Sequence, residues 1–182
     1  IHCHVGSQIE EIHAYVLAMN KFVDRAYEIY DIFGITINKL NAGGGFGICY
    51  TKADKPLEFE LVVDTIMDII TKGFEARNLK RPMVLVEPGR YCVGNAGITL
   101  YTVGSYKNIK DIRDYISVAG GMTDNIRSSL YAAKYDAIIA NKAEMPADRL
   151  VTVAGKNCES GDILIKDIMF KDPKPGDILA LF

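Results

Sequence analysis

The sequence has no long apolar run, no large excess of one charge and no low-complexity segment. Its longest stretch without a charged residue, 91–106, has 16 residues and contains three glycines, whereas a membrane-spanning helix needs about 20 apolar residues. The formal net charge is −2, which gives no electrostatic reason to expect nucleic acid or an anionic membrane as a partner. With 49% apolar and 24% charged residues, the composition excludes a disordered tail, a coiled coil and a collagen-like repeat and predicts a globular protein.

Cysteines are few, and no two of them form a CxxC pair. The four residues Cys3, Cys49, Cys92 and Cys158 are widely separated, and the sequence shows no secretory segment. We therefore expect reduced thiols and a cytoplasmic location. The 182 residues begin and end inside apolar stretches, so we also expect the chain to be a piece of a longer protein.

The first ninety residues alternate between strand and helix patterns. Short apolar segments at 1–5, 35–40 and 83–86 predict strands, and amphipathic segments at 10–33 and 57–72 predict helices. Gly34 provides the signal that ends the first helix. Because the strands are short and continuously apolar, they favour a parallel sheet or barrel buried on both faces.

The pattern changes after about residue 97. Strand-like segments at 98–106, 115–119, 150–154, 163–165 and 178–182 follow one another without a long helix between them. Turns rich in Gly, Asp and Pro separate them, which is typical of an antiparallel β domain. We therefore expect two domains, residues 1–96 and an incomplete β domain of residues 97–182.

A polar or glycine-rich cluster follows each of the first three strands. The clusters are His2-Cys3-His4, Gly43-Gly44-Gly45 and Glu87-Pro88-Gly89-Arg90. In a parallel sheet or barrel the carboxyl ends of the strands share one rim, where active sites lie. We therefore expect the three clusters to lie close together.

The residues alone leave the role of each cluster open. His2 and His4 could bind a divalent metal, but the only other histidine, His13, lies on the first predicted helix and the ligand set is poor. One imidazole could instead pack on a planar ligand, or be a core histidine bonded to a carbonyl group. Gly43–Gly45 could bring backbone N–H groups to an anion or form a tight turn. It is neither a P-loop nor a G-x-G-x-x-G motif.

The two acidic motifs are equally open. Glu87 could be a general base, a metal ligand or the partner of a cationic ring nitrogen, or it could form a plain salt bridge with Arg90. Residues 156–162 form a dense polar segment between two predicted strands. Most of it could be a solvated loop, although Cys158 beside a carboxylate could be a positioned acid or nucleophile.

Taken together and in order, these motifs resemble those of the diaminopimelate decarboxylases, which are pyridoxal-phosphate enzymes. The similar stretches are His2–Ile9, Leu40–Ile48, Glu87–Tyr91, Gly120–Arg127, Leu130-Tyr131 and Gly155–Asp162. The resemblance implies an α/β fold, with the C-terminal part of a TIM-like (β/α)8 barrel followed by an antiparallel β domain. Residues 1–96 would then be the last strand–helix units of the cofactor-binding barrel.

The resemblance also implies a cofactor, pyridoxal 5'-phosphate, and no metal. His4 would stack on the pyridoxal ring and Glu87 would bond the pyridine nitrogen and keep it protonated, so that the ring can accept the electron pair left by departing CO2. The residues implied to bind the cofactor are His4, Ser7, Gly43, Gly44, Gly45, Glu87, Pro88, Gly89 and Arg90.

The implied reaction is decarboxylation of meso-2,6-diaminopimelate to L-lysine. Cys158 would be the acid that reprotonates the substrate carbon, and Glu159 would bind the distal ammonium group. Arg90, Arg127 and Tyr131 would also contact the substrate. A bidentate arginine suits the second carboxylate of diaminopimelate, which ornithine and lysine lack. Where the family has Arg-Pro-Ala-Leu-Tyr, this sequence has Arg127-Ser128-Ser129-Leu130-Tyr131.

The resemblance further places the lysine that binds the cofactor upstream of residue 1, and a tyrosine that contacts the substrate beyond residue 182. We therefore expect the 182 residues alone to be inactive. The family implies a homodimer whose active site is shared between subunits. The alternatives are a related ornithine, arginine or carboxynorspermidine decarboxylase, a catalytically inert regulatory relative, and a metal-dependent barrel hydrolase that uses His2 and His4.

Overall fold

The computed structural model describes residues 1–182, which divide into two compact units. The first unit contains Ile1–Cys49 and Ala53–Asn95, and the second contains Tyr50–Lys52 and Ala96–Phe182. The sequence assigned all of residues 1–96 to one domain. Tyr50–Lys52 belong instead to the second unit, because the ring of Tyr50 packs edge-on against Tyr135, with 5.5 Å between the ring centres.

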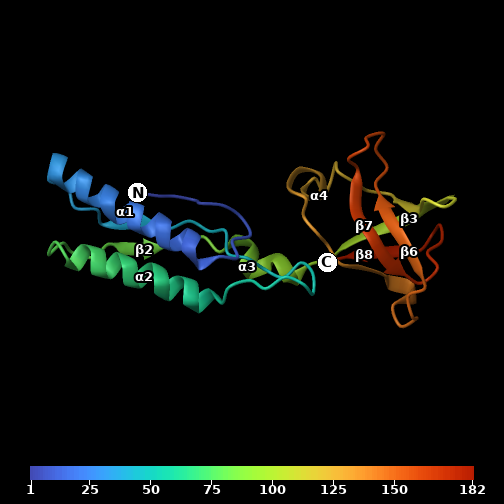
Figure 1. Cartoon of the computed structure of the whole chain (residues 1–182), viewed down its shortest axis with the longest axis horizontal. Helices are drawn as coiled ribbons and strands as arrows, with labels where there is room; N and C mark the ends of the chain where they lie inside the picture. The colour runs from blue at the N-terminus through green and yellow to red at the C-terminus, as the bar shows by residue number, and fades with distance from the viewer. The chain divides into compact units, whose positions relative to one another are not determined.

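The first unit is a layer of parallel strands with two long helices (Figure 1). Strand β1 (Lys39–Asn41) pairs in parallel with β2 (Met83–Leu85), and Leu40 lies opposite Val84. Residues 1–3 lie along the other edge of β1, since Asn41 donates its N–H to Ile1 O over 2.9 Å and Cys3 donates to Asn41 O over 3.1 Å. The carboxyl ends of three parallel segments therefore meet at one edge, as predicted.

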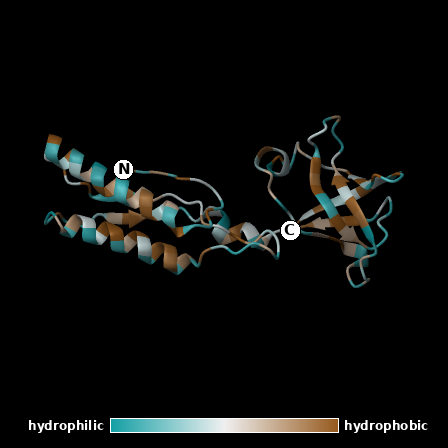
Figure 2. Cartoon of the chain, in the orientation of Figure 1, coloured by the Kyte–Doolittle hydropathy of each residue, from teal (hydrophilic) through white to brown (hydrophobic).

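Two amphipathic helices supply the core of this unit. The buried side chains of α1 (Ile12–Phe33) and α2 (Phe59–Glu75) recur at helical spacing and pack with Leu40 of β1. Figure 2 shows apolar and polar residues alternating along both helices. Gly34 ends α1 in the left-handed conformation, with φ +66°, and donates its N–H to Tyr30 O over 2.8 Å. A short helix, α3 (Gly89–Val93), follows β2 and leads into a 3-10 turn, η1 (Gly94–Ala96).

Two of the expected strands are shorter than predicted. Residues 35–38 form no strand, because pairing with β2 begins only at Lys39 opposite Met83, and Ile35 is 56% exposed. Residues 1–5 were predicted to be the end of a buried strand, but only the bridge between His2 and Asn41 is formed. Ile1 and Val5 are exposed, since this segment has a neighbour on one edge alone.

The second unit is one six-stranded sheet with strand order β5-β8-β3-β4-β6-β7. Its strands are β3 (Thr99–Ile109), β4 (Arg113–Val118), β5 (Ala137–Ile139), β6 (Arg149–Ala154), β7 (Ile163–Phe170) and β8 (Ile178–Leu181). The edge strands β5 and β7 contact each other, so the sheet is nearly closed. A one-turn helix, α4 (Arg127–Tyr131), follows β4, and a 3-10 turn, η2 (Ala140–Lys142), follows β5.

The predicted antiparallel β domain is confirmed except for one pair of strands. All neighbouring strands are antiparallel apart from β4 and β6, which run in parallel with Ile116 opposite Val153. The chain leaves β4, forms α4 and β5, and returns to β6 by a crossover connection, which produces a parallel pair. The core lies inside this nearly closed sheet and contains the fully buried residues Val103, Ile116, Val151 and Leu179.

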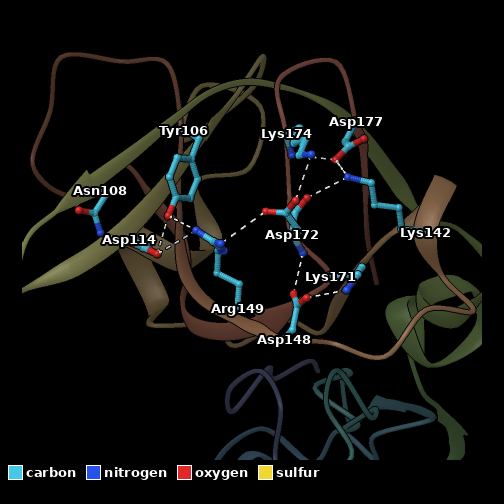
Figure 3. A network of polar contacts seen from close by, with 10 residues as sticks. All are labelled: Tyr106, Asn108, Asp114, Lys142, Asp148, Arg149, Lys171, Asp172, Lys174 and Asp177. Atoms are coloured by element: carbon cyan, nitrogen blue, oxygen red, sulfur yellow. Dashed lines mark hydrogen bonds and ion pairs between the residues drawn. The ribbon is translucent and has the colours of Figure 1, made fainter.

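A network of charged side chains fastens the connection between β7 and β8 (Figure 3). Asp177, which is nearly buried, accepts from Lys142 Nζ over 2.5 Å and from Asn141 Nδ2 over 2.8 Å. Burial alone would raise the pKa of Asp177, but the bonds from Lys142 and Asn141 outweigh it and leave the pKa below its usual value. Arg149 donates to the hydroxyl of Tyr106 over 2.6 Å.

No helix in the structure combines the length and the apolar character needed to cross a bilayer.

Candidate active site

The glycine loop after β1 lies where three backbone segments come close together. A Cβ atom on Gly43 would lie 2.2 Å from Cys3 O, and one on Gly44 would lie 2.3 Å from Glu87 O. Gly43 and Gly45 also have positive φ values, +73° and +87°. A side chain at any of these positions would displace backbone, so the sequence needs glycine to bring the three predicted clusters together.

His4 and Ser7 lie against this loop. His4 Nδ1 accepts a hydrogen bond from Gly44 N over 3.3 Å, and the guanidinium group of Arg90 donates to the hydroxyl of Ser7. Arg90 lies on α3 and Ser7 follows the first extended segment, so the bond joins two parts of the chain that are 83 residues apart. The structure therefore places a cation, a hydroxyl group and an imidazole beside the glycine loop.

Glu87 follows β2 and is held by two side chains. Its Oε1 accepts from Asn41 Nδ2 over 2.8 Å, and its Oε2 is 3.3 Å from His2 Nε2. The bond from Asn41 and then the bond from His2 hold the pKa of this carboxyl below its usual value. Because the side chain remains 52% exposed, Glu87 is an ionised acceptor that a bound group can reach.

Two sets of contacts bear on the roles that the sequence left open at this edge. The N–H groups of Gly43 and Gly44 already have hydrogen-bond acceptors, because Gly43 donates to Asn41 Oδ1 over 2.9 Å and Gly44 donates to His4 Nδ1. The two histidines of the first cluster also have separate partners, since His2 reaches Glu87 and His4 reaches the glycine loop. Residues 1–182 contain no group of three or more His, Cys, Asp or Glu residues arranged to hold a metal ion.

The residue that sequence reasoning missed here is Asn41. It stands two residues before Gly43 and contacts both Glu87 and Gly43. Its place as the last residue of β1 was the available signal, because a polar side chain at the carboxyl end of a parallel strand lies at the edge where sites form.

The donors and acceptors at this edge fit a phosphorylated pyridine ring such as pyridoxal 5'-phosphate. An ionised carboxylate can accept a bond from a protonated ring nitrogen, and the flat imidazole of His4 can lie against an aromatic ring. Arg90, Ser7 and backbone N–H groups are the kinds of donors that bind phosphate. The tight backbone packing around Gly43–Gly45 leaves no room for side chains in the loop itself.

The second unit holds the remaining predicted residues. Cys158 is an exposed free thiol. The carboxylate of Glu159 accepts from Gly161 N over 3.1 Å and from Ser160 Oγ over 3.2 Å. Glu159 thus folds back on its own loop, and its side chain would have to exchange these weak, exposed bonds to bind an ammonium group.

Arg127 and Tyr131 lie four residues apart on one face of α4. The guanidinium carbon of Arg127 is 5.4 Å from the centre of the Tyr131 ring and 5.9 Å from that of Tyr50. Its Nε atom is buried and has no hydrogen-bond partner. Buried donors are normally paired, so this atom is a candidate for binding a ligand.

Two serines attach α4 to the neighbouring loop and strand. Ser128 Oγ donates to Leu164 O over 3.0 Å, and Ser129 Oγ donates to Gly161 O over 2.5 Å. These are the positions at which the sequence departs from the Pro-Ala of the family motif. The two hydroxyl groups therefore give α4 fixed attachments to the segment that carries Cys158 and Glu159.

Comparisons with known proteins agree with this geometry. The family described as "Pyridoxal-dependent decarboxylase, pyridoxal binding domain" matches residues 1–94. The chain is 46% identical over 182 residues to the diaminopimelate decarboxylases of Bacillus methanolicus and Bacillus subtilis (strain 168), and the match covers 100% of this chain and 42% of each relative. The chain therefore spans about two-fifths of the length of these relatives.

A solved structure is also similar over the whole chain. The crystal structure of diaminopimelate decarboxylase from M. jannaschii in complex with L-lysine superposes with a TM-score of 0.88 and 30% sequence identity. The match covers 100% of this chain and 40% of that protein.

Proposed function

Because the chain belongs to the family of pyridoxal-dependent decarboxylases, we propose that it forms part of an enzyme that converts meso-2,6-diaminopimelate to L-lysine and CO2. Relatives that are 46% identical carry the name diaminopimelate decarboxylase. The solved relative holds L-lysine, which is the product of this reaction. The observation that carries the proposal is the convergence of His4, Glu87 and the glycine loop at one edge of the first unit.

Pyridoxal phosphate supplies, when bound, an aromatic ring that accepts the electron pair left by departing CO2. Glu87 keeps a proton at the ring nitrogen, since its lowered pKa makes it an ionised partner for the N–H group. His4 packs against the ring face. The glycine loop, Ser7, Arg90 and the segment with Pro88 and Gly89 hold the phosphate end and fix the orientation.

The second unit supplies the groups that act on the substrate. Arg127 binds the carboxylate at the far end of diaminopimelate, and its unpaired Nε provides a donor for that purpose. Tyr131 lies beside this guanidinium group, and Glu159 binds the distal ammonium group. Cys158, whose thiol is exposed, would deliver a proton to the carbon from which CO2 has left.

Discrimination against simpler diamino acids follows from the same arginine. Ornithine and lysine have no second carboxylate, so their binding would leave the guanidinium group of Arg127 without its partner. Sites built to pair a polar group reject analogues that lack it. The specificity for diaminopimelate thus depends on Arg127 together with Arg90.

We further propose a cytoplasmic homodimer in which the loop with Cys158 and Glu159 completes the site of the partner subunit. All four cysteines are free, which agrees with a reducing compartment.

The proposal is tested by measuring CO2 release by the full-length protein from diaminopimelate, ornithine, lysine and arginine. We expect release from diaminopimelate alone, and a loss of about 100-fold in kcat/KM for Arg127→Ala, because a charge-assisted bidentate contact is removed. Arg113→Ala, which removes the exposed pair with Asp167, is the matched control and should retain full activity.

Two results would contradict this assignment. Release from ornithine or arginine but not from diaminopimelate would assign the chain to a related decarboxylase. Saturable binding of pyridoxal phosphate with no CO2 release from any of the four amino acids would indicate an inert relative.

A further inference from the structure

We propose that Asn41 is a positioning residue that couples Glu87 to the glycine loop, and so sets the distance between the two protein groups that hold opposite ends of the cofactor. This inference rests on the proposed function. It assigns a role to a residue that touches neither substrate nor reacting atoms and that acts through Glu87 and Gly43.

The side chain of Asn41 forms a two-sided bridge. Its Nδ2 donates to Glu87 Oε1 over 2.8 Å, and its Oδ1 accepts from Gly43 N over 2.9 Å. An amide group can donate on one side and accept on the other at the same time, whereas a carboxylate can only accept. Asparagine therefore satisfies both neighbours, and an ionised aspartate of the same size would satisfy Gly43 alone.

The backbone of Asn41 is held on both sides. Its N–H donates to Ile1 O over 2.9 Å, its carbonyl accepts from Cys3 N over 3.1 Å, and it is paired in register with Leu85. The backbone N–H of Glu87 in turn donates to Gly43 O over 2.7 Å. The side-chain amide of Asn41 thus lies between backbone segments that are fixed on both sides. Because the amide is planar, it holds the Glu87 carboxylate at a set distance from Gly43 N.

The charges around Glu87 give the bridge an electrostatic role. The groups that face the Glu87 carboxylate are the amide of Asn41 and the imidazoles of His2 and His4. The hydrogen bond from Asn41 contributes most to lowering the pKa of Glu87. Two lone pairs on each carboxylate oxygen leave Glu87 able to accept a further bond from a ring nitrogen while it keeps its bonds to Asn41 and His2.

Substitution of Asn41 by aspartate would replace the hydrogen-bond donor that faces Glu87 with a second acidic group. Asn41→Asp places a second carboxylate at the 2.8 Å contact with Glu87, and two carboxylates at that distance hold a shared proton because both cannot ionise cheaply. As the pH rises, the pair loses that proton, and an extra negative charge then lies beside the loop that holds the phosphate. Asn41→Ala removes both hydrogen bonds but adds no titrating group.

The test measures the dissociation constant of pyridoxal phosphate for the full-length protein by equilibrium dialysis between about pH 4 and pH 8, a range that includes the second proton loss of an interacting carboxylate pair, near about pH 5. We expect Asn41→Ala to weaken binding about tenfold at every pH. Asn41→Asp should bind more tightly than Asn41→Ala at the acid end of the range, where the shared proton bridges residue 41 and Glu87, and its affinity relative to Asn41→Ala should fall as the pH rises. Asn38→Asp, an exposed position preceding β1, adds the same charge at the other end of the strand and should bind as wild type.

Each other outcome decides against the proposal. Equal, pH-independent losses in the two Asn41 variants would reduce Asn41 to a structural residue, and wild-type affinity in both would remove the role altogether. If Asn41→Asp does not fold, Asn41→Ala still decides, since wild-type affinity in that variant overturns the coupling. Failure of the wild-type protein to bind pyridoxal phosphate would instead overturn the proposed function on which the inference rests.

Discussion

The backbone N–H of Met122 donates a hydrogen bond of 2.7 Å to the carboxylate of Asp162, which is 2% exposed. Asp162 also accepts from Asn157 N over 2.8 Å and from Asn157 Nδ2 over 2.7 Å. A single buried carboxylate therefore ties the loop that precedes α4 to the loop that carries Cys158. Gly155 makes room for it, because a Cβ atom there would lie 2.2 Å from Asp162 Oδ2.

The first prediction concerns this carboxylate. Asp162→Asn turns an N–H group either toward Met122 N or toward the two donors of Asn157, and we expect it to lower the free energy of unfolding of the second unit by about 2–4 kcal/mol. Urea unfolding measures the loss. Asp111→Asn is the control, because Asp111 is exposed with φ +61° and asparagine tolerates that conformation; it should change the unfolding free energy by less than about 0.5 kcal/mol. Equal stability of the two variants would refute the role of Asp162.

The second prediction concerns the two serines of α4. Ser128→Ala combined with Ser129→Ala removes the bonds to Leu164 O and Gly161 O, so α4 loses its attachments while Arg127 is retained. In the full-length protein we expect KM for diaminopimelate to rise about five- to tenfold, since each neutral hydrogen bond contributes about 1 kcal/mol, with kcat nearly unchanged.

Steady-state kinetics separate these two constants. Ser105→Ala, which removes an exposed serine pair with Ser117 on the sheet, is the matched control. A fall in kcat with constant KM would show that the serines do not act through substrate binding.

The third prediction concerns the pair Lys142–Asp177. Lys142→Ala leaves a nearly buried carboxylate without its cation (side-chain exposure 18% for Lys142 and 10% for Asp177), and we expect a loss of roughly 3 kcal/mol in the unfolding free energy. Lys171→Ala breaks the more exposed pair with Asp148 and should cost less than about 1 kcal/mol. Denaturant titration of both variants gives the comparison, and a smaller loss for Lys142→Ala than for Lys171→Ala would contradict it.

The fourth prediction is the pH dependence of stability. Asp177 has a lowered pKa in the folded chain because the bonds from Lys142 and Asn141 outweigh burial, and the Tyr106 hydroxyl lowers the pKa of Asp114. The bond from Lys171 does the same to the pKa of Asp148. The unfolded chain therefore binds protons at a higher pH than the folded chain does, so these groups stabilise the fold above about pH 4–5 and lose that contribution as the pH falls further.

Urea midpoints measured at about pH 7, 5, 4 and 3 should stay level at first and then fall across this window. The double variant Lys142→Met/Asp177→Asn should show a shallower fall than wild type. A midpoint that rises on acidification would have the wrong sign and would contradict the assignment.

Much of the fold follows from sequence pattern. The periodicity predicts α1 and α2 to within three residues at each end, because burying one helical face requires apolar residues at helical spacing. The short elements α3, α4 and β5 were not predicted. Each has three to five residues, and such lengths carry no periodicity, so contacts from the rest of the unit decide their conformation.

The parallel pairing of β4 and β6 could also not be predicted from the sequence pattern. Strand propensity and turn residues identify the strands, but they do not specify which strand becomes a neighbour after a crossover. The candidate site divides in the same way. The strand order predicts that His4, the glycine loop and Glu87 lie together, whereas the bridge made by Asn41 depends on a register that only the folded backbone establishes.

Strand β8 has a consequence for how the second unit is made in the cell. Ile178–Leu181 are hydrogen-bonded to β3 on one side and to β5 on the other, so an interior position of the sheet is occupied by a strand that is translated after both of its neighbours. While the ribosome is still synthesising these residues, β5 has no place in the sheet and one edge of β3 is open. Until residue 181 leaves the exit tunnel, nascent chains of this unit thus expose an edge of β3 that can pair with another strand. The six-stranded sheet forms completely only after that point.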